Sequence, residues 1–196
     1  MKKLVSALFS ATLSVFPAPA QAHHDGGSQF PERRIAIVGD SHVEALGPEL
    51  WSKFAEMGIG CQFKKERGSR AEGWVGSQAL NRWLAEFDPQ IVIVSFGTNE
   101  GMAKSTVEHL AASFRALAEQ LKNRRPDRRI IWIAPPPFSK VPYLANVYAA
   151  LSKTKGIEVP DFSKNVYNEN ETGAHLTRPA YRALADDIRI WLRDHP

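Results

Sequence analysis

The sequence predicts a three-layer α/β fold with a parallel sheet, and two observations support this prediction. Short apolar runs rich in β-branched residues recur at residues 35–38, 91–94 and 130–133. Such runs are typical of strands buried on both faces, as they are in a parallel sheet. Segments with helical periodicity separate the runs. Regular alternation of strand and helix favours a parallel sheet whose connections are right-handed crossovers.

The first half of the domain begins with the strand at residues 35–38, which leads through Gly39 into a helix. Apolar residues in this helix are spaced by three and four positions, as on one helix face; they are Val43, Leu46, Leu50, Phe54 and Met57. A weaker strand is expected at residues 59–63 and a short helix around residues 78–87. The strand at residues 91–94 completes this half.

The second half opens with a long helical stripe, formed by Val107, Leu110, Phe114, Leu117 and Leu121. The strand at residues 130–133 follows, then a shorter helical stripe at residues 144–151 and a weaker strand at residues 157–161. The last helix is expected to begin near Thr177, which can act as its N-cap, with Pro179 in the first turn. The prediction is therefore one domain with five strands.

The amino-terminal 32 residues are expected to lie outside this domain, which we assign to residues 33–196. Two lysines precede an apolar run of 13 residues, and the sequence Ala-Gln-Ala ends at residue 22. This pattern predicts a secretory signal peptide over residues 1–22, and therefore a periplasmic or secreted protein. An uncleaved anchor is the alternative, but a membrane-spanning helix needs roughly 20 apolar residues. Residues 23–32 are polar and glycine-rich, which indicates a flexible leader.

Composition excludes several classes of function. Removal of the signal peptide would leave 23 basic and 21 acidic side chains, so the sequence lacks the charge of a nucleic-acid-binding protein. Cys61 is the only cysteine, which rules out an internal disulfide. No glycine-rich nucleotide-binding motif and no histidine spacing typical of catalytic zinc occurs, so we expect neither a cofactor nor a metal.

Side chains capable of chemistry follow the predicted strands, where sites form in parallel sheets. Ser41 follows the first strand, Gly68 the second, Asn99 the third and His175 the fifth. Acyl transfer needs a hydroxyl nucleophile, a histidine to take its proton, and neutral donors for the oxyanion. Ser41 at a helix start offers its own N–H. Gly68 allows close approach of a backbone amide, and Asn99 supplies an amide donor.

These segments resemble the four blocks of the SGNH hydrolase (GDSL esterase/lipase) superfamily. The matching segments are "GDSH", the glycine of "RGSRAEGW", "GTNE" and "HLT" before the last helix, within residues 34–192. The resemblance implies that Ser41 is the nucleophile and His175 the base. It also implies an oxyanion hole formed by Ser41, Gly68 and Asn99, and a flavodoxin-like five-stranded sheet of order 2-1-3-4-5.

The sequence departs from the family pattern at the acid, which normally stands three residues before the histidine and is here Thr172. Threonine can orient an imidazole but cannot stabilise its cation as a carboxylate does. In a serine protease, replacing the triad aspartate by its amide lowers turnover about 10⁴-fold. Three alternatives remain: a Ser–His dyad, a displaced carboxylate such as Glu171 or Asp161, or loss of catalysis. Glu100 in place of the family's aspartate is expected to have little effect.

The sequence thus predicts an exported serine esterase that hydrolyses carboxylic esters through an acyl-enzyme on Ser41, with O-acetyl groups of glycans as the expected substrate. The alternatives are a lipase- or lysophospholipase-type esterase and a non-catalytic glycan-binding domain of the same fold. The expected partner is a small-molecule or glycan ester, with no nucleic acid and no stable membrane anchor; the oligomeric state is not predicted. His42 is expected on the surface or in support of the site, and Trp74 either stacks on a sugar or packs in the wall.

Overall fold

The computed structural model describes residues 33–196, so the predicted signal peptide and leader lie outside the described residues. Its strands form one parallel sheet and are β1 (Arg34–Gly39), β2 (Gly60–Lys65), β3 (Ile91–Ser95) and β4 (Arg129–Trp132). Their spatial order is β2-β1-β3-β4. This confirms the α/β class, the parallel sheet and the predicted order for these strands.

The predicted fifth strand at residues 157–161 is not formed, and the expectation of five strands was wrong for the described residues. Glu158 alone bridges to β4: its N–H donates to the Ile130 carbonyl at 2.8 Å, and its carbonyl accepts from the Trp132 N–H at 2.7 Å. The next donor in a parallel ladder would be residue 160. That residue is Pro160, which has no N–H, so the pairing stops after one residue.

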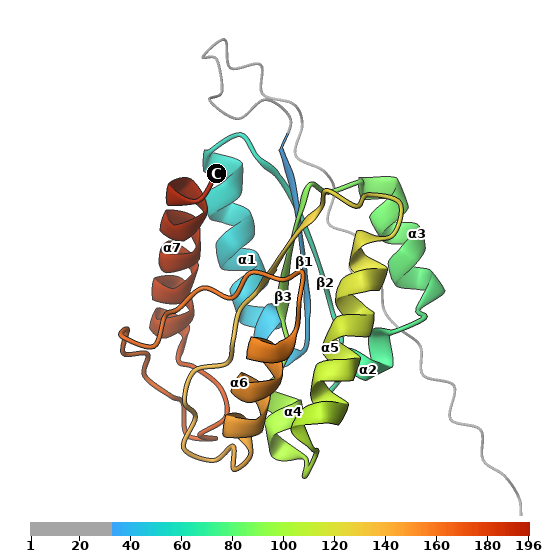
Figure 1. Cartoon of the computed structure of the whole chain (residues 1–196). Coiled ribbons are helices and arrows are strands. Elements are labelled where there is room, and N and C mark those ends of the chain that lie inside the picture. Colours follow the sequence, from blue (N-terminus) through green and yellow to red (C-terminus); the bar gives the residue numbers. More distant parts are fainter. Residues whose placement is uncertain (1–32) are drawn as a thin grey trace, which may run out of the picture.

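Helices cover both faces of the sheet (Figure 1). One face carries α1 (Ser41–Glu56) and α7 (Arg178–Asp194). The other face carries α2 (Ala71–Trp74), α3 (Gln78–Phe87), α5 (Val107–Lys122) and α6 (Leu144–Lys153). A short helix, α4 (Thr98–Met102), follows β3 directly. All the helices expected from the periodicity are present, and α2 and α4 are additional.

Alternate residues of the strands supply two separate cores. In β1, Ile35 and Ile37 pack with α1 and α7, whereas Ala36 and Val38 pack on the opposite side with α3 and α5. Burial of both faces explains why the strand sequences are continuously apolar instead of alternating. Within residues 33–196, no helix is long and apolar enough to cross a membrane.

Candidate active site

Ser41 is the first residue of α1, directly after β1. The preceding residue, Asp40, caps the helix: its Oδ1 accepts a hydrogen bond of 2.9 Å from the backbone N–H of His42. The Ser41 N–H has no hydrogen-bond partner among residues 33–196. The nucleophile candidate therefore stands at the positive end of a helix dipole, with its own amide available to a ligand oxygen.

His175 lies in a tight hairpin that runs directly into α7. Glu169 and Leu176 form an antiparallel bridge at its base. Within the hairpin, the Asn170 N–H donates to the His175 carbonyl at 2.9 Å. Gly173 at the turn has a φ of 63°, a left-handed conformation that favours glycine. These backbone contacts fix the histidine before the last helix begins.

The hairpin brings His175 to Ser41, although the two residues are 134 positions apart in the sequence. The distance between Ser41 Oγ and His175 Nε2 is 2.8 Å, which is suitable for direct proton transfer. Partial burial and the charge of Arg67 lower the pKa of His175, and Glu44 opposes this shift. The imidazole is therefore neutral at pH 7 and able to accept a proton.

Asn99 connects the segment that carries Gly68 to the segment that carries Ser41. Its Nδ2 donates to Asp40 Oδ2 at 2.9 Å and to the Ser69 carbonyl at 3.0 Å. The carboxamide thus bridges the residue before Ser41 and the residue after Gly68. Both of its N–H groups are engaged, so an oxyanion would have to share one of them. Gly68 has a φ of 71°, and its own N–H has no partner in the described part of the chain.

Of the three residues considered as acid or orienting group, the structure brings only Thr172 to the histidine. Thr172 Oγ1 is 3.5 Å from His175 Nδ1, a long contact, and donates a hydrogen bond of 2.6 Å to Asn170 Oδ1. Glu171 and Asp161 are exposed, and neither forms a hydrogen bond or ion pair with His175 in residues 33–196. A relay of neutral groups, from His175 through Thr172 to Asn170, therefore occupies the position of the acid.

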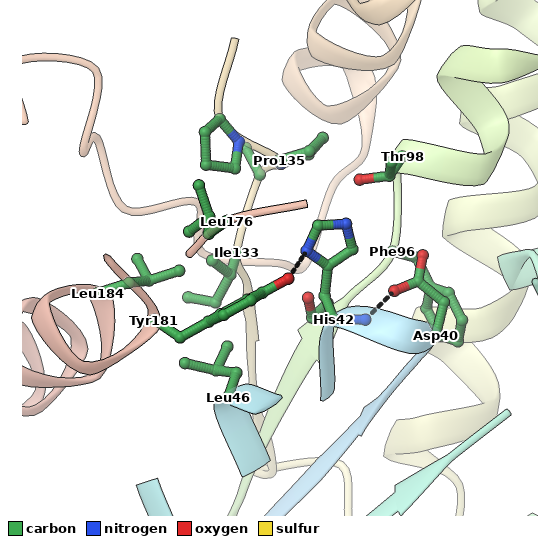
Figure 2. A pocket seen from close by; sticks show the side chains of 13 residues that line it. Asp40, His42, Leu46, Phe96, Thr98, Ile133, Pro135, Leu176, Tyr181 and Leu184 are labelled. Atoms are coloured by element: carbon green, nitrogen blue, oxygen red, sulfur yellow. Dashed lines mark hydrogen bonds between the residues drawn. The ribbon is translucent and has the colours of Figure 1, made fainter. Parts of the chain in front are cut away.

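His42 and Tyr181 are site residues whose role the sequence did not reveal. His42 is buried at 6 % exposure, so of its two expected positions it takes the one beside the site and not the one on the surface. Its ring stacks on that of His175, with 4.7 Å between ring centroids and 11° between planes. Figure 2 shows the hydrogen bond between His42 Nδ1 and the Tyr181 hydroxyl, which is 2.7 Å long. Tyr181 lies in the first turn of α7 and is 4 % exposed.

Two buried carboxyl groups lie behind the candidate donors. Burial raises the pKa of Asp40 to about 7; the His42 amide opposes this shift and Glu100 adds to it. Burial also raises the pKa of Glu100, whose Oε1 accepts a 2.7 Å hydrogen bond from the Ala71 N–H. Its Oε2 has no partner among the described residues. Glu100 therefore connects the segment that carries Asn99 to the start of α2.

Trp74 is a buried residue of the hydrophobic core. It is 4 % exposed, and its Nε1 donates to Ser69 Oγ at 3.0 Å, so its ring is not available to stack on a sugar. Among residues 33–196, no group of three or more His, Cys, Asp or Glu side chains could hold a metal ion.

Comparisons with known proteins agree with this architecture. The model of the GDSL-like Lipase/Acylhydrolase family matches residues 37–189. No curated protein matches the sequence. The fold is similar to a lipase/acylhydrolase from Enterococcus faecalis, with a TM-score of 0.66, 18 % identity, and coverage of 83 % of this chain and 96 % of that one.

Two esterase structures are also similar. The psychrotrophic esterase EstA from Pseudoalteromonas sp. has a TM-score of 0.62 and 18 % identity, with 83 % of this chain and 100 % of that chain covered. A family 3 carbohydrate esterase from Clostridium thermocellum has a TM-score of 0.63 and 17 % identity, with 83 % and 94 % covered. At these identities the likeness shows the fold alone.

Proposed function

The chain belongs to the GDSL-like Lipase/Acylhydrolase family of ester hydrolases, and we propose that it cleaves carboxylic esters through an acyl-enzyme on Ser41. The observation that carries this proposal is the 2.8 Å contact between Ser41 Oγ and His175 Nε2. A hydroxyl is a weak nucleophile at neutral pH, and a neutral imidazole at hydrogen-bond distance activates it. The lowered pKa of His175 keeps that imidazole neutral.

The proposed reaction has two halves. Ser41 Oγ attacks the ester carbonyl carbon while its proton passes to His175 Nε2, and the carbonyl oxygen becomes an oxyanion. The free amides of Ser41 and Gly68, together with Asn99, hold this oxyanion. The tetrahedral intermediate expels the alcohol, which takes the proton from His175. Water then attacks the acyl-enzyme and gives one proton to His175. The second tetrahedral intermediate breaks its bond to Ser41 Oγ and releases the acid, and His175 returns the proton to Ser41 Oγ.

O-acetyl groups of glycans are the substrate that we propose. One similar structure is titled a family 3 carbohydrate esterase. Export through the predicted signal peptide would deliver the enzyme to the periplasm or the medium, where envelope and environmental glycans are found. A lipase-like preference is the alternative within the same chemistry, because another similar structure is titled a lipase/acylhydrolase.

Labelling with a fluorophosphonate tests the nucleophile. The chain is expected to react at one serine, and Ser41→Ala is expected to abolish both labelling and hydrolysis of p-nitrophenyl acetate. Ser152→Ala is the matched control, because Ser152 is an exposed serine on α6 whose hydroxyl bonds only the Ala149 carbonyl. Labelling that persists in Ser41→Ala would contradict the proposal.

Acyl-chain preference tests the substrate. Turnover of p-nitrophenyl acetate far above that of the octanoate ester, together with acetate release from an acetylated xylan, would support the glycan substrate. The reverse preference would instead favour the lipase-like function.

A non-catalytic glycan-binding protein is the second candidate, and it is favoured because no carboxylate of residues 33–196 contacts His175 Nδ1, which faces Thr172 Oγ1. It predicts no labelling of Ser41 and no ester turnover. It also predicts oligosaccharide affinity that Ser41→Ala leaves nearly unchanged.

A further inference from the structure

We propose that His42 and Tyr181 are positioning residues for His175, and that the neutral ring face of His42 stabilises the histidine cation in place of the missing carboxylate. This inference rests on the proposed function. It concerns the step in which His175 takes the proton of Ser41 and becomes positively charged. A group that stabilises this charge accelerates the step, because the charge develops only in the transition state.

The stacking geometry restrains the base. The two imidazoles are nearly parallel, at 11° and 4.7 Å between centroids. A ring stacked in this way cannot tilt without colliding with its neighbour. Both nitrogens of His175 remain free in the ring plane, where Nε2 meets Ser41 at 2.8 Å and Nδ1 faces Thr172 at 3.5 Å. His42 thus restrains the ring without competing for its hydrogen bonds.

His42 is itself held rigidly. Its Nδ1 meets the Tyr181 hydroxyl at 2.7 Å, and the apolar side chains of Leu46, Ile133 and Leu184 lie around the pair in Figure 2. The cavity beside it has a volume of about 10 Å³, room for roughly one water molecule. Movement of the ring is therefore blocked by packing as well as by the hydrogen bond.

The same surroundings keep His42 uncharged. Burial lowers the pKa of His42 to about 3, with a further contribution from His175, whereas hydrogen bonding to the Ala174 backbone opposes the shift. Its Nε2 nevertheless has no partner of ordinary geometry in the described residues. Burial raises the pKa of the Tyr181 phenol, and the Leu176 backbone opposes that shift. Ala174 and Leu176 flank His175, so His42 and Tyr181 lie close to the backbone on both sides of it.

The other groups around His175 supply little net charge stabilisation: Glu44 favours the cation, but Arg67 opposes it. Thr172 offers only a neutral hydroxyl at 3.5 Å. Arg67 is positive and opposes the cation. The charge of Glu44 is shared with Lys65 at 2.9 Å and with Arg67 at 2.7 Å. An aromatic face within about 6 Å attracts a cation, and the His42 face meets this condition.

The decisive experiment separates the aromatic face from bulk packing by comparing His42→Leu with His42→Phe. In His42→Leu, kcat for p-nitrophenyl acetate is expected to fall about 10-fold with KM unchanged, since a 10-fold change corresponds to about 1.4 kcal/mol. The pKa of His175 should fall, because its cation has lost a stabilising neighbour. The acid limb of the pH profile should therefore move to lower pH. His42→Phe keeps a ring face but loses the hydrogen bond to Tyr181, so kcat should fall only about threefold, as in Tyr181→Phe, and the acid limb should stay at its wild-type position. A merely structural role would not move the pH profile.

Tyr181→Phe gives a test that does not depend on a change at His42. It removes one oxygen, and kcat is expected to fall about threefold at constant KM, because packing alone then restrains the His42 ring. The double variant His42→Leu/Tyr181→Phe should be no slower than His42→Leu alone, because both act through the same contact.

The inference is overturned if His42→Leu retains kcat within twofold of wild type, or if His42→Phe loses as much as His42→Leu. If His42→Leu does not fold, full kcat in Tyr181→Phe overturns it. Failure of the proposed function looks different: the wild-type chain itself would then show no ester turnover and no fluorophosphonate labelling.

Discussion

The two ring nitrogens of His175 have unequal partners. Nε2 meets Ser41 Oγ at 2.8 Å, whereas Nδ1 faces the Thr172 hydroxyl at 3.5 Å. That hydroxyl donates its proton to Asn170 Oδ1 at 2.6 Å, so its lone pairs can accept from an Nδ1–H. The contact can select the tautomer that leaves Nε2 free as the base. It supplies no negative charge for the cation that forms during the reaction.

Thr172→Asp is expected to raise kcat about 10-fold or more, because a carboxylate beside Nδ1 stabilises the imidazolium in the transition state. The same carboxylate favours the charged form of His175 and raises its pKa, so the acid limb of the pH profile should move to higher pH. A pH series of kcat/KM on p-nitrophenyl acetate measures both effects. Glu171→Gln, one residue away and exposed, is the control and should change neither. If Thr172→Asp changes neither kcat nor the position of the acid limb, a side chain at position 172 does not reach Nδ1 of His175.

The hairpin over residues 169–176 holds His175, the proposed base, in a fixed position. Its ends are joined by the Glu169–Leu176 bridge, and Ser139 is tied to Glu169 through both its N–H and its hydroxyl. Gly173 contributes a second link, because its carbonyl accepts from the Lys140 N–H at 3.0 Å. The position of His175 therefore depends on backbone geometry several residues away from the ring.

Gly173→Ala is expected to destabilise the fold by about 1 kcal/mol and to lower kcat about 10-fold. Its φ of 63° is unfavourable for alanine, and a Cβ would lie 2.8 Å from Lys140 Cγ and 2.9 Å from Ser139 Oγ. Relief of this crowding displaces the hairpin, and small displacements of catalytic groups have large effects on rate. Thermal melting and steady-state kinetics measure the two effects.

Gly156→Ala is the matched control for that substitution. Gly156 also has a left-handed φ, of 80°, but the only atom near its added Cβ is Lys122 Nζ at 3.6 Å. It should lose similar stability and keep full kcat. Equal losses of kcat in both variants would mean that the hairpin does not set the rate.

The molecule as a whole buries two carboxyl groups at the carboxyl edge of its sheet. Asp40 is inaccessible to solvent, and Glu100 is 3 % exposed with one oxygen unpartnered among the described residues. Burial raises the pKa of both, so the folded state holds their protons more tightly than the unfolded state does. The stability of the domain should therefore decline as the pH rises above the ordinary carboxyl range.

Glu100→Gln is expected to stabilise the fold increasingly as the pH rises, by about 1 to 2 kcal/mol at about pH 8 and by less at about pH 5. The pKa of Glu100 is higher in the folded state than its ordinary value of 4.5, so the protonated carboxyl contributes to folding stability. This contribution is complete below pH 4.5 and is lost as the pH rises through the folded-state pKa. Glutamine keeps an oxygen for the Ala71 N–H and never ionises. Urea unfolding of both proteins at the two pH values measures the difference. Glu119→Gln, on the exposed side of α5, is the control; an equal pH trend there would contradict the assignment to Glu100.

The sequence predicts strands correctly where a continuous apolar run reflects a strand that is buried on both faces. The runs at residues 35–38 and 91–94 are apolar throughout because both sheet faces are covered, and both became strands. The prediction at residues 157–161 failed because strand formation there depends on one missing N–H at Pro160. The apolar character of this segment does not show that the N–H of residue 160 would be needed for pairing with β4.

The candidate site was predictable to a similar degree. Ser41, Gly68 and Asn99 follow strand ends, so the topology brings them to one edge of the sheet. His175 does not follow a strand and reaches the same edge through the hairpin before α7. His42 and Tyr181 could not be found in this way, because their roles depend on a ring stack between segments 133 residues apart in sequence. The double engagement of Asn99 Nδ2 also depends on three-dimensional geometry.

Ser41 opens α1, whereas His175 immediately precedes α7, and these two helices pack side by side on the same face of the sheet (Figure 1). A polypeptide emerging from the ribosome therefore carries its nucleophile long before it carries its base. The pair is assembled only after the last helix has been synthesised and has docked. Under the proposed mechanism, hydrolytic activity would therefore arise only after the last helix has been synthesised and has packed against α1.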